Sequence, residues 1–361
     1  MHSGTWSANR KFCMSLLRDS GFAKTAMEDH MMKEFNRLSE SIGKTNGKPL
    51  DVSDYIVPCA LNNIVSFFYG AQLTHDHPAR HELLQLMKGV GPALFTGPQN
   101  QFLPWTMRRL LSWVPYTRNH GLANVLAKLD SFNIVPSEAV QYLLGFYADD
   151  YLVGHINLFV AAGTLGPTKI MLWQLLNFAR YADTVQARVQ REIDGVVGRE
   201  RQPTWEDRKQ MPYTMACVWE VHRWKTAQPL GPSRLCAQDV VIGDFFIPKG
   251  TTIVPNFWAV HNDPTLWEEP STFRPERYLS EDGKMMKLKP EYLIPFSLGR
   301  RNCVGETFVT MEVFLMVTFL LQKYRIVTER PIEDDIDSPD FDLSPYSPIR
   351  LRFLPRFADI A

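Results

Sequence analysis

A cysteine near the C-terminal end of the chain lies in a segment whose residue types suit metal ligation. The segment Phe296-Ser297-Leu298-Gly299-Arg300-Arg301-Asn302-Cys303-Val304-Gly305 has the spacing F-x-x-G-x-R-x-C-x-G. By average composition, about one chain in ten thousand of this size should match the five fixed positions by chance. A thiolate is a strong metal ligand, and glycines let the backbone turn and approach a bound group closely. The pattern predicts that Cys303 ligates a metal.

The neighbouring residues suit the same chemistry. Arg301 is able to neutralise a buried carboxylate of a bound group, and Phe296 is able to shield the sulfur from water. Cys303 precedes an apolar segment predicted to be a helix, whose N-terminal N–H groups favour a thiolate. Taken without its surrounding pattern, Cys303 would more readily be interpreted as a small buried core residue.

This segment resembles the haem-binding signature of the cytochromes P450, and further segments match that family in the family's own order. They are Trp6-Ser7-Ala8-Asn9-Arg10 (W-x-x-x-R), Glu220-Val221-His222-Arg223 (E-x-x-R), Pro232-Ser233-Arg234 and Pro275-Glu276-Arg277-Tyr278 (P-E-R-F). The resemblance runs from Trp6 to about Leu354, and the connecting stretches are similar to microsomal family 2.

The resemblance implies a haem b cofactor with Cys303 as the ligand of its iron. It also implies haem contacts from Trp6, Arg10, Arg234, Phe296, Arg301 and Gly305, and a structural triad of Glu220, Arg223 and Arg277. The implied fold is the P450 fold, mainly α with a small β portion, in one domain over 1–361. Taken singly, Glu220 and Arg223 would pass for a surface ion pair.

Hydrophobic periodicity predicts a chain that is mainly helical over its first two thirds. Apolar spacing from Ser15 to Leu38 predicts one helix that ends near Gly43 and Gly47. Further helices are predicted over 52–69, 81–90, 122–132, 140–144, 152–179, 184–197, 213–224 and 306–324, with a Pro- and Gly-rich loop over 91–105. Short strands joined by turns are predicted over 240–251.

Composition narrows the class of protein. Lys plus Arg and Asp plus Glu both total 39, so global charge does not indicate a nucleic-acid partner. The five cysteines are scattered and odd in number, which favours a reducing environment over a disulfide framework. No signal peptide or anchor is recognised at the start of the chain, and peripheral membrane contact is expected at most.

The sequence departs from the family pattern in three places. W-x-x-x-R begins at residue 6, so about a hundred residues that would carry the anchor, early helices and early strands are expected to be absent. The stretch between Phe132 and Leu152 is short and poorly matched.

The third departure falls in the long helix over the expected haem. Ala162-Gly163-Thr164-Leu165-Gly166-Pro167-Thr168 places Leu165 and Gly166 where relatives carry an acid and a threonine that relay protons. Thr164 and Thr168 are the nearest hydroxyls and are the candidate catalytic residues. In the alternative interpretation, both hydroxyls bond carbonyls of their own helix. Pro167 is expected to widen the distortion of this helix.

Three functions fit these observations. The first is a haem-thiolate monooxygenase of the endoplasmic reticulum membrane, oxidising a lipophilic substrate with O2 and electrons from NADPH-cytochrome P450 reductase. A basic face of Arg10, Lys11, Arg18, Arg300 and Arg301 would receive that reductase, with cytochrome b5 as a further partner. The second is a haem-thiolate isomerase or dehydratase of a peroxide substrate, which tolerates loss of the relay pair. The third is a truncated, inactive product.

Overall fold

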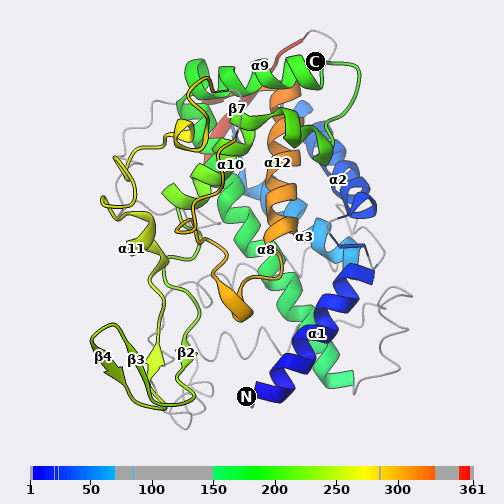
Figure 1. The fold of residues 1–361 in the computed structure, drawn as a ribbon. Coiled ribbons are helices and arrows are strands. Elements are labelled where there is room, and N and C mark those ends of the chain that lie inside the picture. Colours follow the sequence, from blue (N-terminus) through cyan, green and yellow to red (C-terminus); the bar gives the residue numbers. More distant parts are fainter. Residues whose placement is uncertain are drawn as a thin grey trace, which may run out of the picture.

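Two long apolar helices, α8 (Asp149–Arg180) and α12 (Glu306–Lys323), form the centre of the molecule. The computed structural model describes residues 3–19, 21–22, 24–69, 84, 149–283, 286–329 and 349–357. Both helices are apolar on most sides, and such helices are stable only when other elements cover them. They pack against each other through the middle of the molecule (Figure 1).

Shorter helices cover this central pair. They are α1 (Ser3–Asp19), α2 (Thr25–Gly43), α3 (Ser53–Tyr69), α9 (Ala187–Val196), α10 (Pro212–Trp224) and α11 (Phe257–His261). Short helical segments lie between them: the π-helical η2 (Ala182–Gln186) and the 3-10 helices η3 (Trp205–Gln210), η4 (Pro275–Tyr278) and η5 (Gly299–Arg301). α3 packs on α8, and α9 and α10 pack on α12. The prediction of a mainly α fold is confirmed.

The single helix predicted from Ser15 to Leu38 is wrong, because the structure has two helices there. The Phe22 N–H donates to the Leu17 carbonyl at 2.8 Å and the Gly21 N–H donates to the Arg18 carbonyl at 3.2 Å. Gly21 has a φ of +84°. These bonds form a Schellman motif, which ends α1 and needs a left-handed residue, usually glycine. α2 then starts after Lys24, whose backbone is extended.

Other predicted helices are confirmed with small shifts, and some lie outside the described residues. The segments over 52–69, 152–179, 213–224 and 306–324 are α3, α8, α10 and α12, and 184–197 divides into η2 and α9. Pro167 does not interrupt α8, which continues as α-helix on both sides. The helices predicted over 122–132 and 140–144, the helix over 81–90 apart from Leu84, and the loop over 91–105 are not described.

The β portion consists, among the described residues, of three small antiparallel sheets. The largest joins β1 (Leu50–Asp51), β7 (Arg350–Pro355) and β6 (Tyr324–Thr328), which brings the C-terminal region back beside α3. β2 (Arg234–Leu235) pairs with β5 (Thr252–Ile253), and β3 (Val240–Ile242) pairs with β4 (Phe245–Ile247). Gly243 turns the β3–β4 hairpin with a φ of +57°, as the sequence predicts.

None of the helices in the described part of the chain combines the length and hydropathy of a transmembrane segment.

The carboxylate of Glu220 on α10 is fully buried and holds several segments together. Arg223 donates to it twice, from Nε at 2.8 Å and from Nη2 at 2.7 Å. Arg277 Nε donates at 3.0 Å, the Tyr278 hydroxyl at 3.1 Å and the Arg274 backbone N–H at 3.0 Å. A buried charge is tolerated only when it is paired and hydrogen-bonded in this way. The triad of Glu220, Arg223 and Arg277 implied by the sequence is therefore present.

This cluster is linked to the Cys303 loop through His261 on α11. Arg223 Nη1 donates to the His261 carbonyl at 2.9 Å. The His261 ring accepts the Ile294 N–H at its Nε2 (3.0 Å) and lies 2.7 Å from the Thr226 hydroxyl through its Nδ1. Acceptance at Nε2 places the ring proton on Nδ1. Burial lowers the pKa of His261 to about 3, so the ring is neutral and keeps this tautomer.

His222 on α10 supports the same loop from inside. Its ring packs edge-on against Phe296 with centroids 5.0 Å apart. Burial lowers the pKa of His222 to about 3, and its Nε2 has no hydrogen-bond partner among the described residues. His222 therefore acts as a packed ring rather than as a hydrogen-bonded one on that side.

We expect Glu220→Ala to destabilise the chain by about 3–5 kcal/mol, because it leaves buried guanidinium groups without their counter-charge. Urea unfolding measures this loss. Asp183→Ala is the matched control, since it breaks the exposed Arg325–Asp183 pair at 2.7 Å and should cost about 1 kcal/mol or less. Equal small losses in the two variants would contradict the assignment of Glu220 as the organising charge.

We expect His222→Phe to protect the chain against acid. The pKa of His222 is about 3 in the folded chain and has an ordinary value of 6.5. Between these two pH values the unfolded chain binds a proton that the folded chain does not. The free energy of unfolding therefore falls as the pH drops from 6.5 towards 3. The advantage of the variant should grow by up to about 1.4 kcal/mol per pH unit. Denaturation curves between pH 7 and pH 4 test this. His261→Phe should instead be less stable than wild type at pH 7, since it leaves the Ile294 N–H without its acceptor and removes the ring N–H that the Thr226 hydroxyl accepts.

Candidate functional site

The loop that carries Cys303 is a tight turn placed directly before α12. Ser297 and Gly299 have φ values of +63° and +72°, so the backbone is left-handed at both residues. The Cys303 N–H donates to the Phe296 carbonyl at 2.8 Å, and the Asn302 N–H donates to the Gly299 carbonyl at 3.1 Å. The strained position explains Gly299, since glycine adopts a positive φ at no steric cost.

The sulfur of Cys303 is exposed and already accepts a hydrogen bond. The Gly305 N–H donates to Cys303 Sγ at 3.3 Å. α12 begins at Glu306, so Cys303 precedes the helix and meets its N-terminal end through Gly305. A side chain at Gly305 would place its Cβ 3.7 Å from this sulfur, at ordinary contact distance.

The protein atoms around Cys303 disfavour its charged form in the absence of a metal. Desolvation raises the pKa of the thiol, the Gly305 N–H and Arg10 lower it, and Glu306 raises it. A metal that coordinates a thiol deprotonates it outright. The Gly305 N–H bond and the need for a stabilising positive charge therefore suit a sulfur that binds a cation.

Three arginines from separate segments converge beside this loop. Arg10 on α1 donates to the Asn302 carbonyl at 3.0 Å and to its Oδ1 at 2.6 Å. The Arg301 guanidinium carbon lies 3.5 Å from the centroid of the Trp6 ring, and Arg234 Nη2 donates to the Arg301 carbonyl at 3.3 Å. Desolvation first, and then the charges of Arg234, Arg10 and Arg300, lower the pKa of Arg301.

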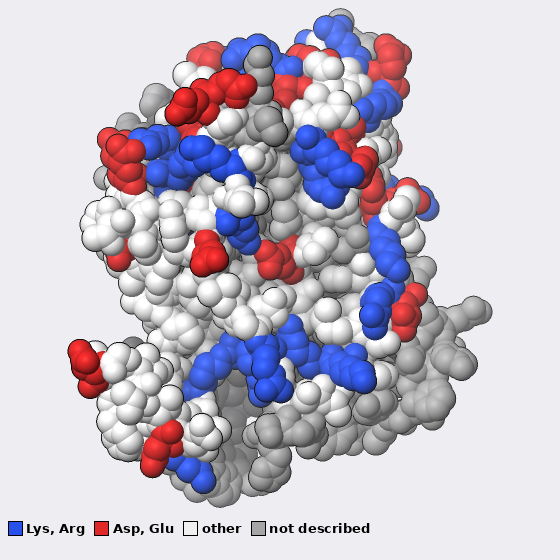
Figure 2. Space-filling view, in the orientation of Figure 1, with Lys and Arg blue, Asp and Glu red and all other residues white. Residues whose placement is uncertain are grey.

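This cationic cradle has no acidic partner in the described part of the protein. None of Arg10, Arg234 and Arg301 forms an ion pair with a described carboxylate, although most other surface arginines in that part do. Figure 2 shows the corresponding band of Lys and Arg side chains where α1, β2 and the Cys303 loop meet, with no acidic side chain among them. Such a cradle fits a ligand that carries carboxylates.

The central helix α8 presents small residues to open space. Ala162 is exposed, and a Cβ built on Gly166, four residues further along, would meet no atom within 4 Å. Residues four apart share one helix face. Gly163 instead packs closely, because its Cβ would lie 2.8 Å from Ile64. Leu165 is fully buried in the core, so it does not line an open pocket.

Both predicted catalytic hydroxyls are buried in the protein. Thr164 Oγ1 donates to the Val160 carbonyl of its own helix at 2.7 Å. Thr168 Oγ1 has no hydrogen-bond partner among the described residues. The alternative that both hydroxyls bond their own helix thus holds for Thr164 only. A catalytic role for either residue remains a prediction.

The structure brings together the predicted residues Trp6, Arg10, Arg234, Arg301 and Cys303, with Phe296 and Gly305 on the same loop. Sequence reasoning missed Asn302, which binds Arg10 through both its carbonyl and its side chain. It also missed His222 and His261, the two buried histidines that contact the segment around the loop. Neither role has a signal in residue spacing, since both depend on contacts between distant segments.

An exposed cysteine sulfur, a partnerless arginine cradle and an open face of small residues on a nearby central helix fit a flat metal complex bearing two carboxylates. Arg10, Arg234 and Arg301 would hold such carboxylates, and the Cys303 sulfur would supply one ligand to the metal.

Comparison of the sequence with known proteins supports the same interpretation of this site. The family model described as Cytochrome P450 matches residues 1–133 and 146–351. The gap in that match falls within the stretch identified above as poorly matched. Cytochrome P450 2U1 of Bos taurus is 31% identical over 347 residues, which cover 89% of this chain and 63% of that protein.

Other relatives have the same family-2 designation. Cytochrome P450 2D9 of Mus musculus is 30% identical over 88% of this chain and 67% of its own length. Cytochrome P450 2F3 of Capra hircus is 32% identical over 95% of this chain and 72% of its own length. The chain thus spans about two thirds of the length of the curated relatives it matches, and the resemblance to family 2 is confirmed. The chain belongs to the cytochrome P450 family.

Proposed function

We propose that this protein is a haem-thiolate monooxygenase that oxidises a lipophilic organic substrate with O2 and electrons from NADPH-cytochrome P450 reductase. The observation that carries the proposal is the exposed Cys303 sulfur, which accepts the Gly305 N–H beside an arginine cradle without acidic partners. When bound, haem supplies an iron centre for oxygen activation, and a thiolate ligand adds the electron density that promotes O–O cleavage.

The side of the site that carries Cys303 is called the proximal side, and the side formed by α8 is called the distal side. Each proximal residue has a role in this proposal. Cys303 ligates the iron, and the Gly305 N–H bond to the sulfur tunes its electron donation. Arg10, Arg234 and Arg301 bind the two propionates, with Trp6 holding Arg301 in place. Phe296 holds the cysteine backbone and shields the sulfur from water.

The distal side lacks the usual acid and threonine, so another hydroxyl must supply protons. Thr168 supports this role because its Oγ1 is uncommitted. Thr164 is the second candidate, although it must first release the Val160 carbonyl. A Cβ at Gly166 would meet no described atom within 4 Å, whereas Thr164 and Thr168, each two residues away, lie on the opposite, buried side of α8. Proton delivery by either hydroxyl would therefore require local rearrangement of this helix.

Surface charge and family membership support our proposals for the redox partners and the location of this protein. The basic band in Figure 2 offers a docking face for the acidic surface of a reductase or of cytochrome b5. Relatives of the microsomal family 2 support a place at the endoplasmic reticulum membrane. In this proposal, residues 1–361 form one P450 domain.

A second function is favoured by one specific observation, the replacement of the relay pair by Leu165 and Gly166. A haem-thiolate isomerase or dehydratase acts on a substrate that already contains an oxygen–oxygen bond and needs no relay. Turnover that requires NADPH and reductase supports the monooxygenase, whereas turnover of a hydroperoxide without an electron donor supports the isomerase.

We expect Cys303→Ala to abolish the thiolate-type band in the carbon monoxide difference spectrum of the reduced, haem-loaded protein, because no sulfur remains at the iron. Cys236→Ala is the matched control, since Cys236 is also a free, partly exposed cysteine, and should keep the band. Persistence of the band in Cys303→Ala would rule out this ligand.

We expect Gly166→Thr to increase the ratio of product formed to NADPH consumed by about tenfold or more, because a hydroxyl at that position restores proton delivery. The Cβ of the new side chain would meet no described atom within 4 Å outside the adjacent helix backbone. Gly195→Thr on α9 has the same empty surroundings and should leave the ratio unchanged. An unchanged ratio in Gly166→Thr would show that the relay does not run along this face of α8.

A further inference from the structure

A buried carboxyl group outside the haem site is hydrogen-bonded to an amide, and one oxygen of each group lacks a donor in the described part of the chain. Glu312 on α12 and Asn63 on α3 are both almost completely shielded from solvent. Asn63 Nδ2 donates to Glu312 Oε1 at 2.8 Å. The remaining oxygens, Glu312 Oε2 and Asn63 Oδ1, have no hydrogen-bond partner among the described residues.

The two orphaned atoms identify what is missing. Both are acceptors when Glu312 is ionised, so neither satisfies the other, and each carries the cost of desolvation without a hydrogen bond. A proton on Oε2 turns it into a donor. The acid and the amide are then able to form two antiparallel hydrogen bonds, and both orphans are satisfied by one proton.

We propose that Glu312 is a neutral carboxylic acid at physiological pH, that its Oε2–H donates to Asn63 Oδ1 in a reciprocal two-bond pair joining α3 to α12, and that alkaline pH opens this pair. Burial supports the neutral form, since desolvation raises the pKa of Glu312 to about 8 while the Asn63 N–H lowers it.

Within the described part of the chain, no charged side chain is a cause of the pKa shift of Glu312. The elements packed against α12 carry charged side chains, but none of these is a cause of the shift. Most of them have partners of their own: Glu34 with Arg37, Glu192 with Thr214, Glu220 with Arg223, Asp207 with Arg201 and Arg325 with Asp183. Lys169 of α8 likewise contributes nothing to the shift.

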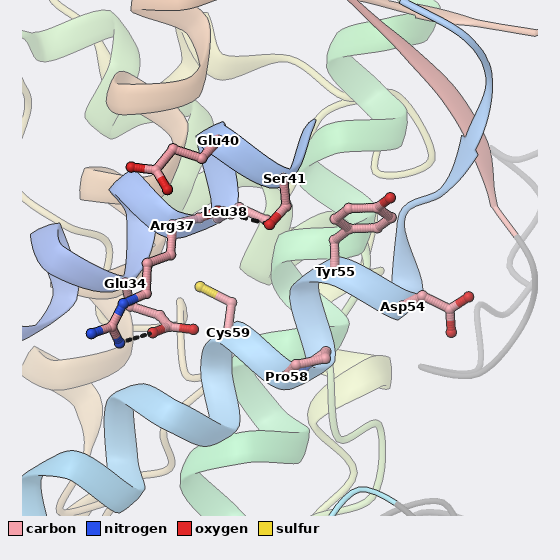
Figure 3. Close-up of a pocket in the computed structure, with 9 residues that line it drawn as sticks. All are labelled: Glu34, Arg37, Leu38, Glu40, Ser41, Asp54, Tyr55, Pro58 and Cys59. Atoms are coloured by element: carbon pink, nitrogen blue, oxygen red, sulfur yellow. Dashed lines mark hydrogen bonds and ion pairs between the residues drawn. The ribbon is translucent and has the colours of Figure 1, made fainter. Parts of the chain in front are cut away.

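The neighbouring Asn62 also binds a buried glutamate, so the two pairs can be compared. Asn62 Nδ2 donates to Glu34 Oε2 at 2.7 Å, so two consecutive asparagines each bind a buried glutamate. Glu34 also meets the guanidinium of Arg37 at 3.3 Å, at the edge of a hollow between α2 and α3 (Figure 3). A cation satisfies the charge of Glu34, whereas at Glu312 only a proton is able to do so.

In the Glu312–Asn63 pair, Glu312 lies on the helix that follows the Cys303 loop. Glu312 lies six residues after Glu306, the first residue of α12, or about 9 Å along the helix axis. Ionisation of Glu312 would leave a buried charge on the helix that directly follows Cys303.

The first test is urea unfolding of the full chain between pH 5 and pH 9 for wild type, Glu312→Gln and Glu34→Gln. A raised folded pKa means that the wild type loses stability as the pH rises from the ordinary value of 4.5 to about 8. Its unfolding equilibrium constant should rise relative to that of Glu312→Gln by up to about tenfold per pH unit. Gln reproduces both hydrogen bonds without titrating, and Glu34→Gln should keep the wild-type dependence. Equal pH dependence in wild type and Glu312→Gln overturns the proposal.

The second test is infrared spectroscopy, which also decides the matter if Glu312→Gln does not fold. The wild type should show a protonated-carboxyl C=O band that disappears with a midpoint near pH 8, the folded value of Glu312. Asn63→Leu removes both hydrogen-bond partners of the carboxyl and should shift the frequency of this band. A neutral-pH spectrum with no band sensitive to Asn63→Leu overturns the proposal.

Discussion

The structure depends on how one buried carboxylate, that of Glu220, is compensated. Five donors from α10 and the segment around η4 converge on its two oxygens. Because an uncompensated charge in the interior costs several kcal/mol, the segments that supply these donors are held in one arrangement. Arg223 then extends this arrangement outward through the His261 carbonyl, and His261 holds the backbone at Ile294. The cysteine loop therefore rests on a chain of polar contacts that starts in the core.

This rigidity explains how an exposed and strained turn presents a sulfur atom in a defined direction. Left-handed backbone at Ser297 and Gly299 is tolerated where surrounding contacts determine the conformation. Here His222 packs against Phe296 from within, and the Phe296 carbonyl accepts the Cys303 N–H. On the outer side, Arg10 reaches across from α1 to Asn302 and ties the first helix to the same loop. Segments from both ends of the chain thus position one thiol.

Much of the proximal side was predictable because its chemistry needs particular residue types. Residue types and spacing pointed to Arg301 and Cys303, the resemblance to the cytochromes P450 implied Trp6, Arg10 and Arg234, and the structure places these residues close together. The long apolar segments α8 and α12 were predictable from length alone. Periodicity failed at the break after α1, because apolar spacing continues across it and the signal lay in the single residue Gly21. The contact between His261 and Ile294, 33 residues apart, and that between Asn63 and Glu312, 249 residues apart, depend on tertiary packing and left no local pattern.

The proximal and distal sides of the site differ in how far they follow the family. The proximal side retains its cradle and loop, whereas the distal helix presents Ala162 and Gly166 to open space. The central claim is that Cys303 Sγ would ligate the iron of a bound haem, and X-ray absorption fine structure at the iron edge tests it most directly. The account predicts one sulfur scatterer in the first coordination shell of the haem-loaded wild type and none in Cys303→Ala. A first shell of nitrogen and oxygen alone in the wild type, or a sulfur scatterer retained in Cys303→Ala, would contradict it.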